Sequence, residues 1–82
     1  MTQQMPHELI LYTGPHCELC DHALDVIAQL PDNAVNVKSV NIRNSTELYH
    51  LYGARIPVIK RVDSSAELGW PFDLEALETF LI

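Results

Sequence analysis

The sequence predicts an α/β domain with elements in the order β-α-β-α-β-β-α, and three observations support this prediction. The chain has 82 residues, enough for one hydrophobic core, so we expect a single domain over residues 1–82 with residues 1–7 as a loose tail. Short apolar runs alternate with segments whose apolar residues recur at helical spacing. The two cysteines, Cys17 and Cys20, stand where the first apolar run meets the first helical segment.

The first strand and the first helix follow from the apolar pattern. Residues 8–12 form an apolar run suited to a buried central strand. The next segment predicts a helix that buries one face and ends at residues 31–33, which are Pro-Asp-Asn. The expected buried face comprises Leu19, Ala23, Ile27 and Leu30, widened by Leu24 and Ala28.

The middle of the chain predicts a second strand and a short helix. Residues 35–42 carry valine and isoleucine with polar residues between them, which favours a strand. Asn44, with Glu47 three residues later, indicates a variant of the capping box that opens a helix. Gly53 is expected to end that helix.

The last third of the chain predicts a hairpin and a final helix. We expect strands at residues 57–62 and 66–70, joined by a turn at residues 63–65. Asp73 is a favourable N-cap for a helix after this hairpin. The face of that helix expected to be buried carries Leu74, Leu77 and Leu81.

The cysteine pair is the feature that bears most directly on function. At the start of a helix, Cys17 would meet unpaired backbone N–H groups and the positive end of the helix dipole, which favour a thiolate. Cys20 lies one turn further on the same side, within reach for a disulfide. The spacing therefore predicts a redox dithiol, with Cys17 as nucleophile and Cys20 as resolving thiol. A metal half-site completed by a histidine, or two inert thiols, are the alternatives.

Charge and composition narrow the class of partner. The net charge of −6 argues against nucleic acid and against an anionic membrane surface. No apolar run is long enough to span a bilayer, and the N-terminus has no signal-peptide pattern, so we expect a cytoplasmic protein. We also expect it to be a monomer. In the cytoplasm a redox or metal role for two cysteines is a better interpretation than a structural disulfide.

Two motifs carry a resemblance to a known family. Residues 13–20 read Thr-Gly-Pro-His-Cys-Glu-Leu-Cys, and residues 52–58 read Tyr-Gly-Ala-Arg-Ile-Pro-Val. With the order of elements, these make the chain similar, from residue 8 to residue 82, to the thioredoxin superfamily, and above all to small bacterial glutaredoxin-like proteins. The resemblance implies a thioredoxin-like fold, with a four-stranded mixed sheet flanked by three helices. It also implies a cis bond between Ile56 and Pro57 in a loop that faces the dithiol.

The chemistry expected is thiol–disulfide exchange with a disulfide-containing protein or a small thiol compound. Cys17 and Cys20 are the candidate catalytic residues, and the candidate substrate-binding residues are His16, Arg55, Ile56 and Pro57. Glu18 and Asp21 are suited to a first helical turn, but their charge opposes a thiolate beside them, so we expect only modest thiolate stabilisation. A binding or adaptor module with little redox activity, and a small metal carrier, are the alternative functions.

The chain departs from the glutaredoxin pattern at positions that bear on glutathione. Glu18 and Leu19 stand between the cysteines where glutaredoxins have Pro-Tyr, and Gly14 stands where a lysine is common. Residues 68–73, Leu-Gly-Trp-Pro-Phe-Asp, replace the paired glycines and acid that help to hold glutathione. We therefore expect no bound cofactor, and we expect glutathione to bind weakly and to serve at most as a reductant.

Overall fold

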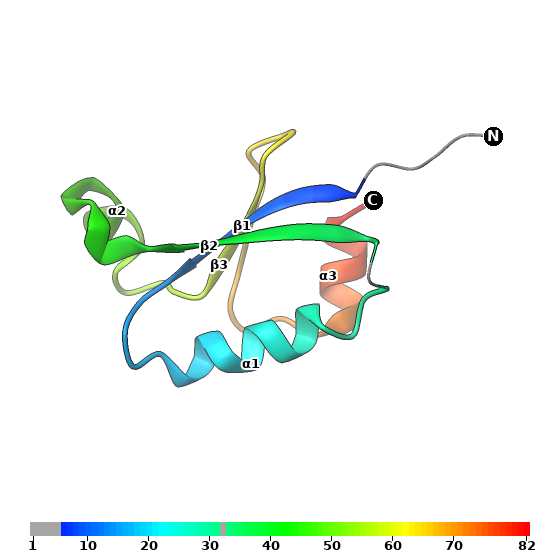
Figure 1. Ribbon diagram of the computed structural model, residues 1–82, viewed down its shortest axis with the longest axis horizontal. Helices are drawn as coiled ribbons and strands as arrows, with labels where there is room; N and C mark the ends of the chain where they lie inside the picture. The colour runs from blue at the N-terminus through cyan, green and yellow to red at the C-terminus, as the bar shows by residue number, and fades with distance from the viewer. Residues whose placement is uncertain (1–5, 32) are drawn as a thin grey trace.

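The computed structural model describes residues 6–31 and 33–82, and its strands and helices follow the predicted order (Figure 1). Within the described part of the chain, the 3-10 helix η1 is an addition to the predicted elements. The elements are β1 (His7–Thr13), α1 (Glu18–Ile27), β2 (Val35–Asn41), η1 (Ile42–Asn44), α2 (Thr46–Tyr52), β3 (Val58–Arg61), β4 (Glu67–Gly69) and α3 (Leu74–Phe80).

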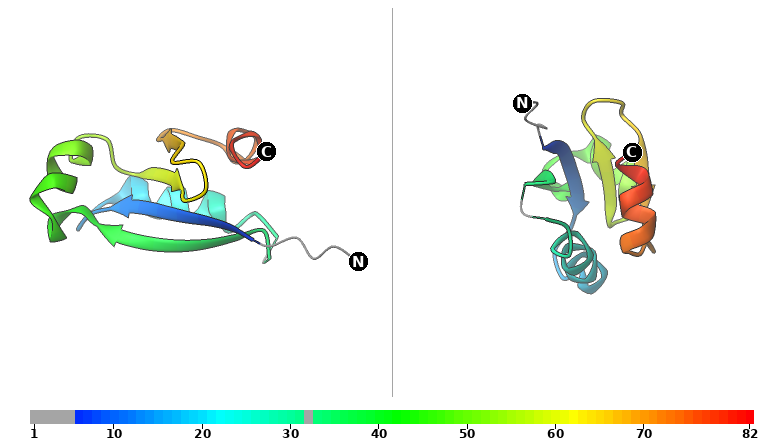
Figure 2. Two further views of the ribbon diagram at one scale, coloured as in Figure 1. Left: turned by 90° about the horizontal axis from the view of Figure 1, so that it is seen from above. Right: turned by 90° about the vertical axis from the view of Figure 1, so that its right-hand side faces the viewer.

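The four strands form one mixed sheet in the order β2-β1-β3-β4. β1 pairs in parallel with β2 and antiparallel with β3, and β3 pairs antiparallel with β4. α1 and α3 share one hydrophobic core on the same face of the sheet, and α2 packs with a second core at the other end (Figures 1 and 2). The mixed sheet and its three helices are as the resemblance implied.

β1 is the central strand and contributes to both cores. Leu9 and Leu11 are fully buried in the core beneath α1 and α3, whereas Tyr12 belongs to the core beside α2. Successive side chains of a strand point to opposite faces, so a strand covered on both sides reads as a continuous apolar run. Burial of each such side chain stabilises the fold by roughly 1.5–3 kcal/mol.

The predicted buried face of α1 is partly wrong. Cys20, Ala23 and Ile27 are the buried residues of this helix. Leu19 is 48% exposed and Leu24 is 43% exposed, and Ala28 is exposed as well. Both leucines lie next in sequence to a buried residue, and each step of one residue turns a helix by about 100°, which carries their side chains toward the rim.

The start of α2 also differs from the prediction. Ser45, not Asn44, is the N-cap, because its hydroxyl accepts a hydrogen bond from the backbone N–H of Leu48 at 3.3 Å. Asn44 ends η1, which places it one residue too early to cap α2. The predicted end is confirmed, since Gly53 is the C-cap and its N–H donates to the carbonyl of Tyr49.

The hairpin and the last helix agree with the prediction apart from short strand ends. β3 and β4 are each shorter than expected, and residues 62–64 form the turn between them. Asp73 is the N-cap of α3 as predicted, and its carboxylate accepts a hydrogen bond from the N–H of Ala76 at 2.8 Å. Leu77 is fully buried, whereas Leu74 and Leu81 are half-buried.

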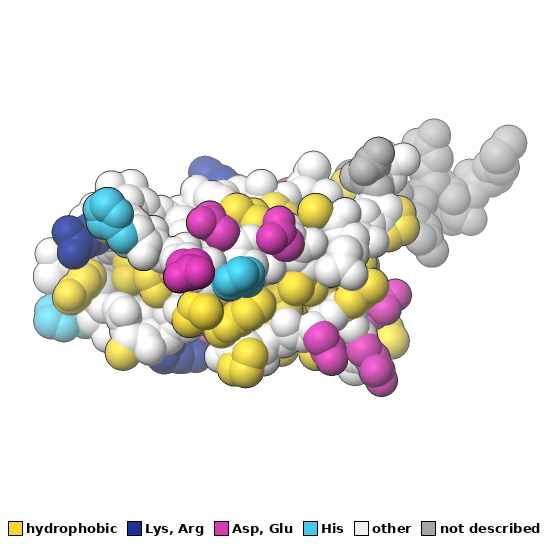
Figure 3. Space-filling model, turned by 90° about the horizontal axis from the view of Figure 1, so that it is seen from below, with side chains coloured by type: hydrophobic (Ala, Val, Ile, Leu, Met, Phe, Trp, Pro, Cys, Tyr) yellow, Lys and Arg dark blue, Asp and Glu magenta, His cyan; other side chains and the backbone are white. Residues whose placement is uncertain are grey.

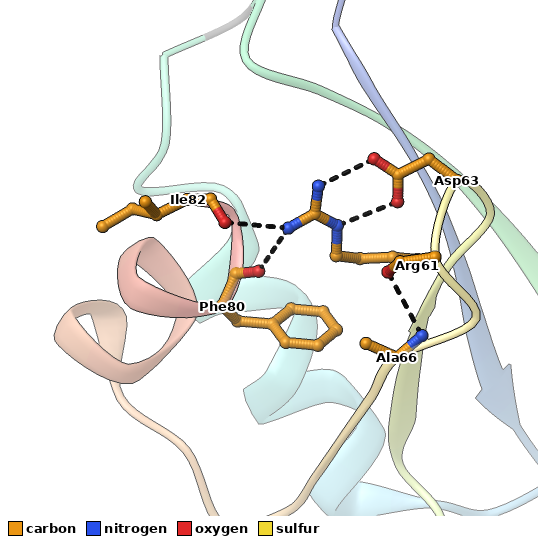
Figure 4. A network of polar contacts seen from close by, with 6 residues as sticks. Arg61, Asp63, Ala66, Phe80 and Ile82 are labelled. Carbon is orange, nitrogen blue, oxygen red and sulfur yellow. Dashed lines mark hydrogen bonds and ion pairs between the residues drawn. The ribbon is translucent and has the colours of Figure 1, made fainter.

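One arginine ties the hairpin to the end of α3 (Figure 4). The guanidinium of Arg61 donates two hydrogen bonds to the carboxylate of Asp63, at 3.0 and 2.7 Å, and one to the carbonyl of Phe80 at 2.8 Å. The hydrogen bonds lower the pKa of Asp63 below its usual value and raise the pKa of Arg61. This contact holds the far end of the molecule, away from the cysteines.

The predicted tail over residues 1–7 lies mostly outside the described residues. Its last residue, His7, belongs to β1 instead, because it pairs with Val35 and its N–H donates to the carbonyl of Ala34 at 3.0 Å.

Candidate active site

Cys17 and Cys20 are joined by a disulfide at the start of α1, with their Cα atoms 5.2 Å apart. Cys17 is the N-cap of the helix, and its Sγ accepts a hydrogen bond from the backbone N–H of Cys20 at 3.1 Å. That bond satisfies one of the N–H groups that the first turn of a helix leaves unpaired. Cys20 is only 3% exposed and Cys17 is half-buried, so an incoming molecule reaches Cys17 first.

His16 precedes the disulfide in the loop that joins β1 to α1, residues 14–17, which we name the redox loop. Its backbone φ is 57°, in the left-handed region, and its side chain is exposed. This conformation costs an L-residue roughly 1–2 kcal/mol, although histidine adopts it more often than most residues do. The turn at His16 directs the chain from the strand into the helix.

The loop between α2 and β3, residues 53–57, lies against the redox loop, and we name it the proline loop. A Cβ placed on Gly14 would lie 2.9 Å from Cδ1 of Ile56, so the two loops are in close contact. The bond between Ile56 and Pro57 is cis, and Pro57 is fully buried. The carbonyl of Pro57 accepts a hydrogen bond from the N–H of Trp70 at 3.1 Å, which ties the loop to the end of β4.

The guanidinium of Arg55 contacts side chains of two other elements, α2 and β4. Its guanidinium lies 3.4 Å from a carboxylate oxygen of Glu67 and 5.6 Å from the ring centre of Tyr52. Tyr52 donates its hydroxyl hydrogen to Glu67 and stacks on Tyr12, with 4.2 Å between ring centres. The hydrogen bond to Glu67, followed by burial, raises the pKa of Tyr52 above its ordinary value. The cluster joins α2, β1 and β4 beneath the proline loop.

Two hollows lie on either side of the redox loop, and Gly14 lines both of them. The larger has a volume of about 400 Å³ and lies between α1 and the sheet, with Cys17, Leu24 and Ser39 in its wall. The smaller has a volume of about 190 Å³ and lies toward α2 and the proline loop, with Ile56 in its wall.

The charged side chains of the two hollows have opposite sign. Glu18 and Asp21 line the larger one, together with His16. Arg43 lines the smaller one. Sequence reasoning missed Arg43, because it lies far from both motifs and reaches the redox loop only through the packing of η1 and α2. Its place directly after the second predicted strand was the one signal available.

The family of the chain follows from comparison with known proteins. A family model described as a glutaredoxin-like domain (DUF836) matches residues 8–82. The chain belongs to this glutaredoxin-like family. No curated protein matches this glutaredoxin-like domain.

Solved structures of similar proteins support the same fold. The X-ray structure of target protein XcR50 from X. campestris is 38% identical, with a TM-score of 0.79, and the match covers 89% of this chain and 93% of the other. The solution NMR structure of protein Ne2328 from Nitrosomonas europaea is 25% identical, with a TM-score of 0.84, and covers 100% of this chain and 99% of the other. The thioredoxin-like fold of this glutaredoxin-like domain is thereby confirmed.

Two further results concern metal and membrane. Over residues 6–31 and 33–82 of the glutaredoxin-like domain, no three side chains of His, Cys, Asp or Glu lie together as a metal ion would require. Among the described helices, none is both long enough and apolar enough to cross a membrane.

Proposed function

We propose that this glutaredoxin-like domain is a thiol–disulfide oxidoreductase that acts on a disulfide-containing protein or a small disulfide compound. The observation that supports this most is the arrangement of the cysteine pair. Cys17 is accessible and accepts a backbone hydrogen bond at the start of α1, whereas Cys20 is buried behind it. Such a pair provides an exposed nucleophile and a protected second thiol.

In the reduced protein, the Cys17 thiolate attacks one sulfur of the substrate disulfide. A bond forms between Cys17 Sγ and that sulfur, and the other substrate sulfur leaves as a thiolate. The Cys20 thiol passes its proton to this departing thiolate and then attacks Cys17 Sγ. The second substrate sulfur leaves and takes a proton from water. The substrate gains two electrons and two protons, and the protein is left with its disulfide.

The substrate backbone is proposed to bind along the proline loop, which contains the candidate substrate-binding residues Arg55, Ile56 and Pro57. Two of its backbone groups are already bonded: the N–H of Ile56 donates to the Tyr52 carbonyl at 3.1 Å, and the Pro57 carbonyl accepts from Trp70. We therefore propose that a substrate N–H donates to the carbonyl of Ile56. His16 borders the same disulfide from the redox loop. Arg55 would contribute only indirectly, by holding Tyr52 and Glu67 beneath the proline loop.

A binding module with little redox activity is the second candidate. Glu18 and Asp21 in the first turn of α1 favour it, because their negative charge opposes the thiolate that the reaction needs. A measured redox potential and rate of disulfide exchange separate the two candidates.

We further propose that the protein acts as a cytoplasmic monomer and that a thiol compound or a dithiol protein regenerates its reduced form.

Trapping of reaction intermediates tests the oxidoreductase. The C20S variant should form a mixed disulfide with a peptide disulfide and retain it, while C17S should form none under the same conditions. Mass spectrometry measures the added peptide mass directly. In a second experiment, mild oxidation of the unmodified, reduced protein should remove two hydrogens without forming a dimer. Free thiols that persist in glutathione-disulfide buffer, in protein that is properly folded, would contradict the proposal.

A further inference from the structure

The start of α1 presents apolar side chains to solvent beside the disulfide. Leu19 and Leu24 are 48% and 43% exposed, and they flank the buried Cys20 and Ala23 in sequence. Figure 3 looks onto this side of the molecule, where hydrophobic side chains form a band over α1 and acidic side chains gather next to it. The two leucines are five residues apart, about 140° around the helix, so they lie on opposite sides of its buried stripe. Leu24 lines the larger hollow beside Cys17, whereas Leu19 lies outside it, so Leu24 is the apolar contact that this hollow offers.

Within the described residues, no lysine or arginine pairs with the acidic side chains of this surface. Glu18 and Asp21 are exposed and line the larger hollow. The salt bridges found over residues 6–31 and 33–82 give Glu18 a histidine neighbour, His22, at 4.0 Å, and pair Asp21 with no lysine or arginine. The carboxylates are therefore available to a cation from another molecule.

We propose that this surface receives the protein that exchanges its disulfide with Cys17, through an arginine or lysine of that protein placed beside an apolar residue. The proposal rests on the oxidoreductase function proposed above and names its class of partner. The long side chain of arginine or lysine has an apolar stem and a charged head. The stem would cover Leu24 at the wall of the hollow, and the head would reach Glu18 and Asp21.

The charge of the smaller hollow favours one orientation of the partner protein over the other. On the far side of Gly14, Arg43 is the charged residue of the smaller hollow. A partner that spans the redox loop therefore meets negative charge toward α1 and positive charge toward α2. The orientation that places the partner's basic side chain over α1 pairs opposite charges, and the reverse orientation brings that side chain to Arg43, which has the same charge.

Two matched peptides test the proposal without relying on catalysis. Each carries a leucine beside a central serine, and one has arginine where the other has glutamine. Binding to the oxidised protein is followed by NMR chemical shifts at low salt. The E18Q/D21N variant is compared with E75Q/E78Q, which removes the same charge from exposed residues of α3 at the opposite end of the molecule (Figure 1).

We expect the arginine peptide to shift signals of Glu18, Asp21, Leu24 and Ser39, and to bind about tenfold more weakly to E18Q/D21N. E75Q/E78Q should change its affinity by less than about twofold, and the glutamine peptide should not distinguish the variants. Equal weakening by both double variants, or shifts confined to other elements, would overturn the proposal. The same peptides with cysteine for serine, as disulfide dimers, are then mixed with the reduced protein, whose two thiols supply the electrons. Binding without reduction of the peptide disulfide contradicts the oxidoreductase function alone.

Discussion

The backbone N–H of Cys20 points at the sulfur of Cys17, with 3.1 Å between nitrogen and sulfur. Because Cys17 is the N-cap of α1, this contact places the sulfur at the positive end of the helix dipole. The helix contributes about 0.3–1 kcal/mol toward a negative charge in such a position, and up to about 2 kcal/mol in a favourable geometry. The negative charges of Glu18 and Asp21 destabilise a thiolate at Cys17. The reactivity of Cys17 therefore depends on the small difference between stabilisation by the helix and destabilisation by these carboxylates.

The two thiols of the reduced protein should differ in reactivity. Cys17 is accessible and lies at the helix start, whereas Cys20 is 3% exposed, so we expect iodoacetamide to modify Cys17 about tenfold faster at neutral pH. Peptide mapping after a brief pulse measures both rates in one sample. Urea-unfolded protein is the control, in which the difference should vanish. Faster modification of Cys20 would reverse the roles assigned to the two cysteines.

The acidic residues of the first helical turn should slow the reaction of Cys17. Replacing Glu18 by glutamine and Asp21 by asparagine removes two negative charges near the thiolate, and we expect alkylation of Cys17 to become about threefold faster at low salt. The effect should shrink as salt is added, since both side chains are exposed. The E75Q/E78Q variant serves as control, and an equal acceleration there would show that net charge alone is responsible.

The corrected burial pattern of the helices predicts a contrast in stability. Leu77→Ala removes a fully buried side chain from the core shared by α1 and α3, and should lower the free energy of unfolding by about 2–5 kcal/mol. Leu19→Ala should cost less than about 0.5 kcal/mol, because that side chain is 48% exposed. Urea unfolding of the oxidised variants gives both values. A comparable loss of stability in Leu19→Ala would show that Leu19 belongs to the buried face, as the apolar pattern predicted.

Tyr52 should ionise at a higher pH in the folded protein than in the unfolded chain. Its hydrogen bond to Glu67 and its burial raise its pKa, so the folded state holds the phenol proton more tightly than the unfolded state does. The resulting stability is fully present below the unfolded tyrosine pKa of about 10 and is lost as the pH rises above it. Ultraviolet titration of the phenolates should show one late component, which Y52F removes and E67Q moves toward lower pH. A late component that persists in Y52F would contradict this.

Glutathione should bind weakly and support little turnover. Its carboxylates need several placed donors, but Gly14 has no cationic side chain, Arg55 is paired with Glu67, and Pro71 has no N–H to donate. Arg43 in the smaller hollow is one available cation, and the net charge of −6 repels an anion at long range. Chemical-shift mapping with reduced glutathione measures the affinity. Saturable binding in the micromolar range, centred on Cys17 and Pro57, would contradict the prediction.

Local chemistry was sufficient to predict the order of elements and the position of the cysteine pair. A helix start depends on a capping side chain within a few residues, which is why Asp73 could be recognised in the sequence. The same locality explains the error at Asn44, because Asn44 and Ser45 are adjacent and both suit an N-cap. In the structure Asn44 is the last residue of η1, and Ser45 is the N-cap of α2.

Tertiary packing decided which faces and charges meet at the site. The sheet selects the side of α1 that it covers, so Leu19 and Leu24 are exposed despite an apolar pattern that fits a buried face equally well. Arg55 pairs with Glu67, and Arg43 comes to the redox loop, only when α2 and β4 take their places beside β1 and β3. The sequence by itself determined the reactive pair and its helix, because those depend on neighbours along the chain. Glu18 and Asp21 are neighbours of the pair along the chain, but Arg43 is distant in sequence, and only the folded sheet brings it to the redox loop.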